Sequence, residues 1–354
     1  MDDQYELVAG ALSSDPTRAR ASAAELHIAP ERSYADFREM ARAEAARADG
    51  IDVVAIVTPN HMHHAPARAF LDAGVHVICD KPLCRTLEEA EDLARVVPAS
   101  GKVFVLTHNY TGYPMVRQAR EMVASGALGA IRTVQVEYPQ EWLTTALETT
   151  GQKQAAWRTD PERSGAAGCL GDIGTHAFQL AEFATGLRCE SLVAELTIFV
   201  PGRRLDDNVQ MLLDFEGGAR GSLWCSQVAP GHQNGLRLRV YGESGGLEWV
   251  QEQPNRLRYA AFGKPVCVIT RGGAGAREAA AHATRIPAGH PEGYLEAFAQ
   301  IYRDAAELIR ACDEKRAPDP ACVLIPGIDD GVRGMRFIDA AIRSSRAGQR
   351  AAVR

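Results

Sequence analysis

Two residues in "GDIGTH" (171–176) are of the types that proton transfer requires. Asp172 and His176 are four positions apart, so on a helix they would share one face. A histidine held beside a carboxylate is a common general acid–base arrangement. The same spacing also fits a helix that merely begins with an acidic turn and buries a histidine. Spacing alone leaves both interpretations open.

A third residue, Lys81, lies in "DKP" (80–82), directly after the apolar run "VHVIC" (75–79). A lysine at a strand end is usually a solvated surface residue. Here the following Pro82 restricts the lysine backbone toward extended geometry, which would aim the ammonium group at a fixed target. The tripeptide "TPN" (58–60) ends another apolar run. Because ligands of open α/β sheets bind at the carboxyl ends of the strands, both stretches are predicted to face a ligand.

Strand and helix patterns alternate in the first third of the chain. The run "IDVVAIVTP" (51–59) lacks polar alternation, which is typical of a parallel strand covered on both faces. Thr86 and Glu89 have the spacing of a capping box, and Ser33 is a candidate N-cap. Further strands are predicted at 6–12, 75–79 and 102–109, and helices at 16–26, 33–47, 63–73 and 86–97. Strands separated by such helices predict a parallel sheet.

The pattern changes after about residue 113. Glycine-containing turns at 215–221 and 241–249 predict hairpins, and the small-residue stretch 272–283 is predicted to be a loop. Helices are predicted at 114–125, 172–185, 291–312 and 328–347, and strands at 131–138, 192–200, 207–215, 219–227, 236–241, 246–251 and 256–260. This pattern predicts a largely antiparallel sheet with helices on one face.

Size and composition narrow the class of protein. A chain of 354 residues suggests two domains, and a net charge of −6 provides no basic surface for nucleic acid. The apolar runs are too short to span a membrane, and the acidic start lacks a secretory pattern. The eight cysteines include no CxxC pair, which favours buried reduced thiols over disulfides or zinc. No carboxylate cluster accompanies "HMHH" (61–64), so we expect no bound metal. The reduced thiols and the start of the chain lead us to expect a cytoplasmic protein.

The motifs together resemble the glucose–fructose oxidoreductase / inositol 2-dehydrogenase / MocA (Gfo/Idh/MocA) family. The resemblance is carried by "TPNHMH" (58–63), "DKP" and, about ninety residues later, "GDIGTH", and it extends from residue 6 to about 345. "HNYTGYP" (108–114) and "GHPEGYLEAF" (289–298) are typical of one branch of the family, and these motifs do not identify its substrate. The resemblance implies NAD(P)-dependent oxidation or reduction of a hydroxyl carbon in a sugar, cyclitol or related polyol.

The resemblance also implies a fold and an assembly. The expected class is α/β, with an N-terminally truncated Rossmann-type domain (1–112) and a C-terminal α+β domain (113–354) that has a large, mostly antiparallel open sheet. The C-terminal helices could pack back on the first domain. The open sheet face would join two or four copies into a homodimer or homotetramer, and neither nucleic acid nor membrane is expected as a partner.

Individual residues acquire roles from the resemblance. In the catalytic trio, His176 would accept the hydroxyl proton, Lys81 would stabilise alkoxide charge, and Asp172 would orient the imidazole or bind a neighbouring hydroxyl. NAD or NADP would contact Ser13, Ser14, Thr58, Pro59, Asn60, His63, Asp80, Lys81 and Asn109. Substrate would contact Lys81, Tyr110, Trp157, Arg158, Asp160, Asp172, His176 and His290. Position 80 is Asp where the family usually has Glu, which keeps the charge.

The family's GxGxxG loop is not found at the start of the chain. Later glycine clusters, at 242–246 and 272–277, open no strand–turn–helix unit. By the resemblance, 6–12 is the second strand, so a strand, loop and helix of roughly 30 residues would precede it. We expect that the chain begins at an internal methionine and, as written, binds cofactor weakly or not at all; a degenerate family member is the alternative. Ser13 and Ser14, where NAD enzymes carry an acid, leave NAD versus NADP open.

Three functions compete at this point. A polyol or sugar dehydrogenase would produce net NADH when substrate is added. An NAD-dependent glycosidase of the same superfamily would release sugar without net NADH. The missing loop suggests a third hypothesis, a degenerate, non-catalytic sugar-binding protein. A measurement of nicotinamide binding separates this hypothesis from the other two.

Overall fold

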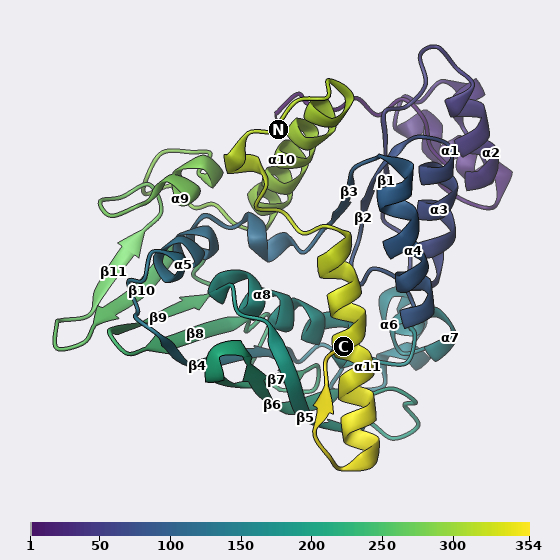
Figure 1. The fold of residues 1–354 in the computed structure, drawn as a ribbon. Helices are drawn as coiled ribbons and strands as arrows, with labels where there is room; N and C mark the ends of the chain where they lie inside the picture. Colours follow the sequence, from purple (N-terminus) through teal and green to yellow (C-terminus); the bar gives the residue numbers. More distant parts are fainter. Residues whose placement is uncertain (1) are drawn as a thin grey trace.

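The structure is a computed structural model, and it describes residues 2–354. Two sheets organise the chain, one of three parallel strands and one of nine strands. Figure 1 shows the small sheet beside the N-terminal helices and the large sheet on the opposite side of the molecule. The predicted α/β class, with a parallel sheet followed by a mostly antiparallel one, is confirmed.

The small sheet has the strand order β1-β2-β3. Its strands are β1 (Val53–Ile56), β2 (His76–Cys79) and β3 (Phe104–Leu106), and the helices around them are α1 (Pro16–Glu25), α2 (Phe37–Ala45), α3 (His64–Asp72) and α4 (Leu87–Ser100). All residues of β2 and β3 are buried, as expected for apolar strands covered on both faces. The predicted capping box is present, because Thr86 accepts the amide hydrogen of Glu89 and the Glu89 carboxylate accepts that of Thr86.

The predicted strand at 6–12 is wrong. Only Gly10 pairs with another segment, through a single bridge to Ser33, and Leu7 and Leu12 remain exposed. Strand geometry requires a continuous ladder of hydrogen bonds, and within residues 2–354 this segment finds a partner at one position only. The apolar pattern was read correctly as extended chain, but its pairing was not.

One helix start and one predicted loop also differ from the prediction. Helix α2 begins at Phe37 and not at 33, because Asp36 rather than Ser33 accepts the first free amide hydrogens. The predicted loop at 272–283 contains a short helix, α9 (Glu278–Ala283). Its sequence, EAAAHA, is rich in alanine, the strongest helix former, so intrinsic propensity favoured the helix.

The nine-stranded sheet has the order β11-β10-β9-β8-β4-β7-β6-β5-β12, and only β4 and β7 pair in parallel. The strands are β4 (Ile131–Pro139), β5 (Cys189–Thr197), β6 (Asn208–Phe215), β7 (Arg220–Ser226), β8 (Arg237–Gly242), β9 (Gly245–Val250), β10 (Arg256–Ala261), β11 (Cys267–Thr270) and β12 (Ala351–Ala352). The hairpins predicted at 215–221 and 241–249 connect β6 to β7 and β8 to β9. The prediction missed β11 and β12, which have four and two residues.

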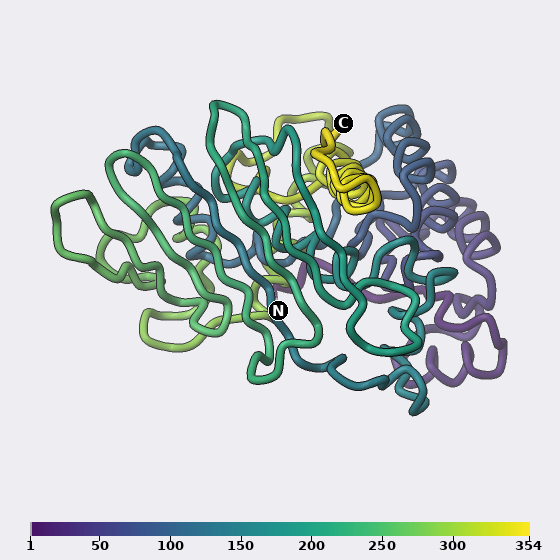
Figure 2. The backbone as a smooth tube through the Cα atoms, turned by 90° about the horizontal axis from the view of Figure 1, so that it is seen from below, coloured from purple at the N-terminus to yellow at the C-terminus, as the bar shows by residue number. Residues whose placement is uncertain are grey.

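Helices cover one face of this sheet and leave the other open. In β4, Val134 and Val136 are buried against the helices, whereas Gln135 and Glu137 point to the open face. The covering helices include α5 (Pro114–Ala124), α8 (Thr175–Thr185) and α11 (Ile328–Ala347). Helix α10 (Tyr294–Asp313) packs instead on the turn that follows β3. Figure 2 shows α11 nearly end-on between the strands of the large sheet and the N-terminal helices, and α11 contacts both β5 and α4.

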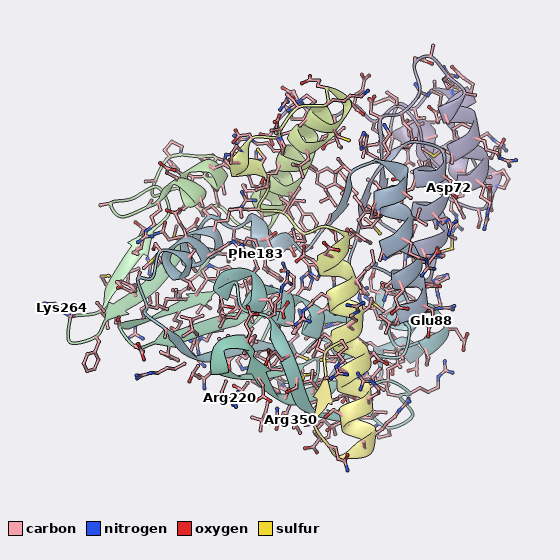
Figure 3. All side chains as sticks on the ribbon, in the orientation of Figure 1. Asp72, Glu88, Phe183, Arg220, Lys264 and Arg350 are labelled. Atoms are coloured by element: carbon pink, nitrogen blue, oxygen red, sulfur yellow. The ribbon has the colours of Figure 1, made fainter. Side chains whose placement is uncertain are left out.

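The surface and the cysteines fit the composition. Charged residues such as Asp72, Glu88 and Lys264 lie at the periphery (Figure 3). All eight cysteines are free, and six of them are buried. No helix within residues 2–354 combines the length and apolarity needed to cross a bilayer.

A buried ion pair joins α5 to α10. Nη2 of Arg117 lies 2.6 Å from Oδ2 of Asp304, and both side chains are fully buried. Arg117 also donates to the carbonyl oxygen of Thr111, in the turn that follows β3. Because a buried charge is tolerated only when it is paired, this ion pair fixes α5 and α10 relative to the end of the small sheet.

We expect that Arg117→Ala destabilises the protein strongly. Removal of one partner leaves the Asp304 carboxylate buried without its countercharge, at a cost of about 3–5 kcal/mol. Urea denaturation followed by circular dichroism measures the change in the free energy of unfolding. Arg343→Ala, which breaks an exposed pair with Asp339 on α11, is the control and is expected to leave the midpoint nearly unchanged. Equal effects of the two substitutions would contradict the importance given to the buried pair.

Candidate active site

Asp172 and His176 lie at the start of α8, as the helix prediction for 172–185 implied. The structure refines that prediction, because residues Leu170–Gly174 form a π-helical turn that leads into α8. Such turns are frequent at functional sites because they redirect side chains out of the regular helical spacing. The carboxylate of Asp172 binds Lys81, Gln227 and Arg158, and within the described residues no hydrogen bond joins it to the imidazole of His176.

The approach to this turn is held by Asp206. Its two carboxylate oxygens accept the amide hydrogens of Gly168 and Leu170, at 2.8 and 2.7 Å, and its backbone oxygen accepts that of Cys169. A Cβ atom at position 168 would lie 2.3 Å from the Asp206 carbonyl oxygen, so only glycine fits there. The small residues at 165–168, which precede "GDIGTH", thus allow the close approach of a buried carboxylate.

Lys81 and Asp172 form the centre of the site. The ammonium group of Lys81 donates to Oδ1 of Asp172 at 3.0 Å and to the backbone oxygen of the same residue. The other carboxylate oxygen accepts from Gln227 at 2.9 Å and lies 3.3 Å from Nε of Arg158. Burial opposes ionisation of Asp172, but Lys81 and Arg158 hold its pKa at about 2. The carboxylate therefore stays ionised and fixes the ammonium group in place.

His176 joins this group from the first turn of α8. The rings of Tyr110 and His108 meet it edge-on, with centroid distances of 4.9 and 5.5 Å. Burial, aided by the charge of Lys81, lowers the pKa of His176 well below its ordinary value. Within the described residues, its Nδ1 is buried without a hydrogen-bond partner, and Nε2 is not among the buried atoms that lack one. A neutral imidazole can accept a proton.

Two of the predicted cofactor residues line the strand ends beside this pocket. Asp80 accepts a hydrogen bond from the hydroxyl of Thr107 at 2.6 Å, which links the end of β2 to that of β3. Asn109 is buried, and its amide nitrogen has no hydrogen-bond partner within the described residues. An unpaired buried amide is costly unless a ligand satisfies it, so this group fits a polar ligand at the strand ends.

The polar side chains after β1 form hydrogen bonds within their own loop and to two neighbouring segments. The hydroxyl of Thr58 donates to the Met62 carbonyl, and the amide of Asn60 donates to the Ser164 carbonyl. The imidazole of His63 lies between the carbonyl oxygens of Thr58 and Pro82, at 2.7 and 2.8 Å. These three side chains shape the strand end, and Pro59, which precedes the short turn at 60–62, is the N-cap of that turn.

The remaining predicted residues fall into two groups. Arg158 and Tyr110 belong to the pocket through Asp172 and His176. The others make local contacts: Ser13 accepts from the Asp15 amide, Ser14 is exposed, Trp157 donates to Gln154, Asp160 pairs with Arg204, and His290 is exposed while its carbonyl accepts from Arg271. Within the described residues, none of these five contacts Lys81, Asp172 or His176.

Sequence reasoning missed three residues that the structure places at the site. Gln227 directly follows β7, and its position at the end of a predicted strand was the available signal. His108 is the first residue of "HNYTGYP", but its spacing from the other site residues did not indicate a role. Asp206 lies far from the catalytic motifs in sequence, so only the fold brings it to the π-helical turn.

We expect Asp206 to make stability depend on pH. Burial raises its pKa to about 6, against the opposing effect of the two amide hydrogen bonds. The unfolded value is about 3.9, so between these values the folded protein holds a proton that the unfolded chain lacks, and the free energy of unfolding falls as the pH rises. Asparagine does not titrate. The stability advantage of the wild type over Asp206→Asn should therefore shrink between about pH 4.5 and 7.

Urea denaturation at the two pH values measures this difference. Asp329→Asn, at an exposed position on α11, is the matched control and should show no such trend. A difference between wild type and Asp206→Asn that is constant with pH would contradict the account.

The fold and the site together define a class of protein. Lys81, which follows a strand of the parallel sheet, lies beside an ionised aspartate and close to a neutral histidine, which are contributed by the turn and helix that cover the large sheet. Two family models match the chain: residues 1–109 match "Oxidoreductase family, NAD-binding Rossmann fold" and residues 116–248 match "GFO/IDH/MocA C-terminal domain".

Similar proteins agree with this class over the full length. The uncharacterized oxidoreductase YfiI of Bacillus subtilis is 34% identical over 97% of this chain and 88% of its own. A solved oxidoreductase from Sinorhizobium meliloti is 54% identical, with a TM-score of 0.89 over 98% of this chain and 92% of that one. An inositol dehydrogenase homologue from Azotobacter vinelandii, complexed with NAD+, is 38% identical, with a TM-score of 0.93 over 98% and 90%. The chain therefore belongs to the Gfo/Idh/MocA family of oxidoreductases.

Proposed function

We propose that this protein transfers hydride between the nicotinamide of NAD(P) and a hydroxyl-bearing carbon of a sugar, cyclitol or related polyol. The observation that carries the proposal is the fixed position of Lys81. Asp172 holds its ammonium group at 3.0 Å, and the neutral His176 lines the same pocket. One cation and one proton acceptor are the two groups that oxidation of an alcohol requires.

Each residue of the site acts on the alcohol in a defined way. His176 accepts the hydroxyl proton at its Nε2. Lys81 stabilises the negative charge that develops on the alcohol oxygen, as a donor already oriented before reaction. Asp172 acts through Lys81 and not through the imidazole, and Arg158 and Gln227 keep its second oxygen occupied.

The residues at the strand ends fit the nicotinamide part of the cofactor. Asn109 presents an unpaired amide there, and Asp80 is held in one orientation by Thr107. Bound in this place, the nicotinamide would exchange hydride with the substrate carbon. The Azotobacter relative has also been solved with NADH and myo-inositol, which supports a cyclitol as the first substrate to test.

The proposal is tested with a panel of cyclitols and sugars, each with NAD and with NADP. Growth of absorbance from the reduced cofactor identifies a dehydrogenase. Release of sugar without net reduced cofactor would identify a glycosidase instead. NADH binding without turnover of any panel member would contradict the proposed substrate class.

We expect Lys81→Met to lower kcat by about 10²–10³-fold, because the preorganised cation is lost. We expect His176→Gln to lower it by about 10²–10⁴-fold, because no base receives the proton. Steady-state kinetics with the best panel substrate measures both. Lys264→Met, which removes an exposed lysine at the β10–β11 hairpin, is the matched control. Retention of wild-type kcat by Lys81→Met would refute the role given to the lysine.

We further propose that the open face of the nine-stranded sheet joins copies of this chain. Leu212 on β6 is 59% exposed there, beside a cleft of about 680 Å³ that Val193, Trp224 and Arg239 help to line. Exposed apolar side chains within a broad sheet face favour association.

We expect Leu212→Glu to convert the oligomer to monomers, because the charge would be buried without a partner. Light scattering coupled to size-exclusion chromatography measures the mass. Val323→Glu, at an exposed position outside the sheet, is the control and should leave the mass unchanged. A monomeric wild type would contradict this proposal.

A further inference from the structure

Two clusters, each of one histidine, one cysteine and one aspartate, lie outside the pocket around His176 within the described residues. In each, one donor atom per residue lies within 4.8 Å of the others. Sequence spacing predicted no metal site, because each cluster combines residues that lie far apart in the chain. The two clusters have the same composition, so their hydrogen bonds decide whether either can bind an ion.

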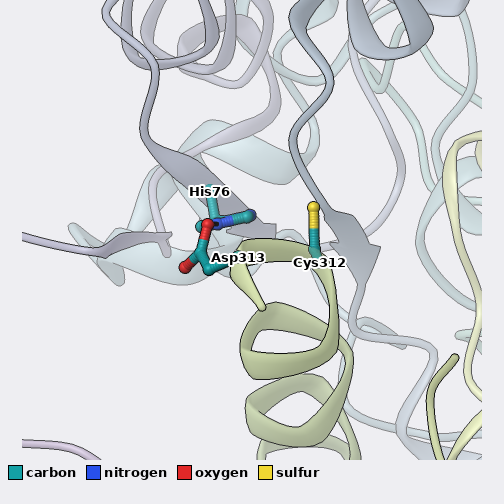
Figure 4. A group of neighbouring side chains, drawn as sticks. All are labelled: His76, Cys312 and Asp313. Atoms are coloured by element: carbon teal, nitrogen blue, oxygen red, sulfur yellow. Dashed lines mark hydrogen bonds and ion pairs between the residues drawn. The ribbon is translucent and has the colours of Figure 1, made fainter. Parts of the chain in front are cut away.

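The cluster of His76, Cys312 and Asp313 is already occupied by its own hydrogen bonds. Figure 4 shows it where the end of α10 meets β2. Nδ1 of His76 accepts the amide hydrogen of Val103 at 2.9 Å, so in the neutral ring the proton lies on Nε2, which donates to Asp313 at 3.1 Å. The ammonium group of Lys102 lies 3.2 Å from the same carboxylate oxygen. A cation and a fixed tautomer both exclude a metal ion here.

The cluster of His282, Asp304 and Cys322 differs on both points. Its cation, Arg117, pairs with Oδ2 of Asp304 and not with the oxygen that faces His282, and no hydrogen bond fixes the tautomer of the imidazole within the described residues. Nε2 of His282, on α9, lies 2.8 Å from Oδ1 of Asp304 on α10 and 3.7 Å from the sulfur of Cys322. No hydrogen bond within the described residues engages Nδ1 of His282, and this atom retains contact with solvent. The ring proton can therefore lie on Nδ1 and leave the Nε2 lone pair directed at the other two donors.

The carboxylate of this cluster is oriented by a second layer of residues. Arg117 pairs with Oδ2 of Asp304, and the amide of Gln300 donates to Oδ1 at 2.8 Å. Both partners are buried, so the carboxylate cannot turn away from His282. Ligating carboxylates and imidazoles in metal sites are typically held by such outer hydrogen bonds.

One of the two donor distances agrees with a tetrahedral ion, and the other requires a small movement. Bond lengths of about 2.3 Å to sulfur and 2.05 Å to nitrogen or oxygen would separate sulfur from nitrogen by about 3.6 Å and nitrogen from oxygen by about 3.3 Å. The first of these agrees with the observed 3.7 Å, and the second requires the observed 2.8 Å to open by about 0.5 Å. A surface cleft of about 530 Å³, lined in part by His282, Cys322 and Glu307, gives access for the ion and a water molecule.

We propose that His282, Asp304 and Cys322 bind one divalent cation of the zinc class, with water from the cleft as the fourth ligand. Nitrogen, sulfur and carboxylate oxygen form the donor set that Zn²⁺ accepts and that Mg²⁺ and Ca²⁺ do not favour. The ion would tie α9 to α10 and to the short turn Pro320–Cys322. It takes no part in the proposed hydride transfer, so this inference does not rest on the proposed function.

Titration of the metal-free protein with Co²⁺ tests the site, because a cysteine thiolate bound to Co²⁺ gives a charge-transfer absorption band. We expect one equivalent to bind with this band, and Zn²⁺ to displace it. Cys322→Ser should abolish the band and weaken binding at least tenfold. Cys312→Ser, which removes the cysteine of the other cluster, is the matched control and should keep both.

His282→Gln provides a second variant in case Cys322→Ser disturbs folding, and thermal unfolding checks each protein. The His282→Gln variant should retain the thiol yet bind Co²⁺ at least tenfold more weakly. Persistence of the band in folded Cys322→Ser, wild-type affinity in His282→Gln, or failure of the folded wild type to bind either ion would each overturn the proposal.

Discussion

The ionised carboxylate of Asp172 is the constraint on which the site depends. It is largely shielded from solvent, which opposes ionisation, and two cations and one amide hold it ionised. One of those cations, Lys81, comes from the end of a parallel strand in the small sheet, while Asp172 itself comes from the helices that cover the large sheet. The ion pair therefore both links the two sheets and fixes the group that would stabilise charge on a substrate.

The surrounding structure is arranged to keep this carboxylate in one place. Asp206 holds the approach to the π-helical turn through two amide hydrogen bonds, and Gly168 permits its close approach. The π-helical turn directs Asp172 toward Lys81 and leaves His176 among aromatic rings, where burial keeps the imidazole neutral. The environment lowers the pKa of both groups, so that Asp172 stays ionised while His176 stays neutral and able to accept a proton.

Much of the fold and part of the site could be predicted from the sequence. Periodicity located most strands, since the apolar run at 53–56 and the alternation along β4 follow from burial on two faces or one. It failed at 6–12, because pattern reports burial and not hydrogen-bonded partners. Lys81, Asp172 and His176 were found as motifs, but the partner of Asp172 was not, because a π-helical turn changes which side chains meet. Gln227 and Asp206 reach the site only through tertiary packing, which one sequence does not display.

The central claim is that Asp172 acts through Lys81, and a double-mutant cycle tests it most directly. Values of kcat/KM are compared for the wild type, Lys81→Met, Asp172→Asn and the double variant, with the best substrate of the panel. If the carboxylate serves to fix the ammonium group, the double variant should be scarcely worse than Lys81→Met alone, because residues that act as a unit are not additive. Losses that multiply in the double variant would show that the two residues act independently and would contradict the account.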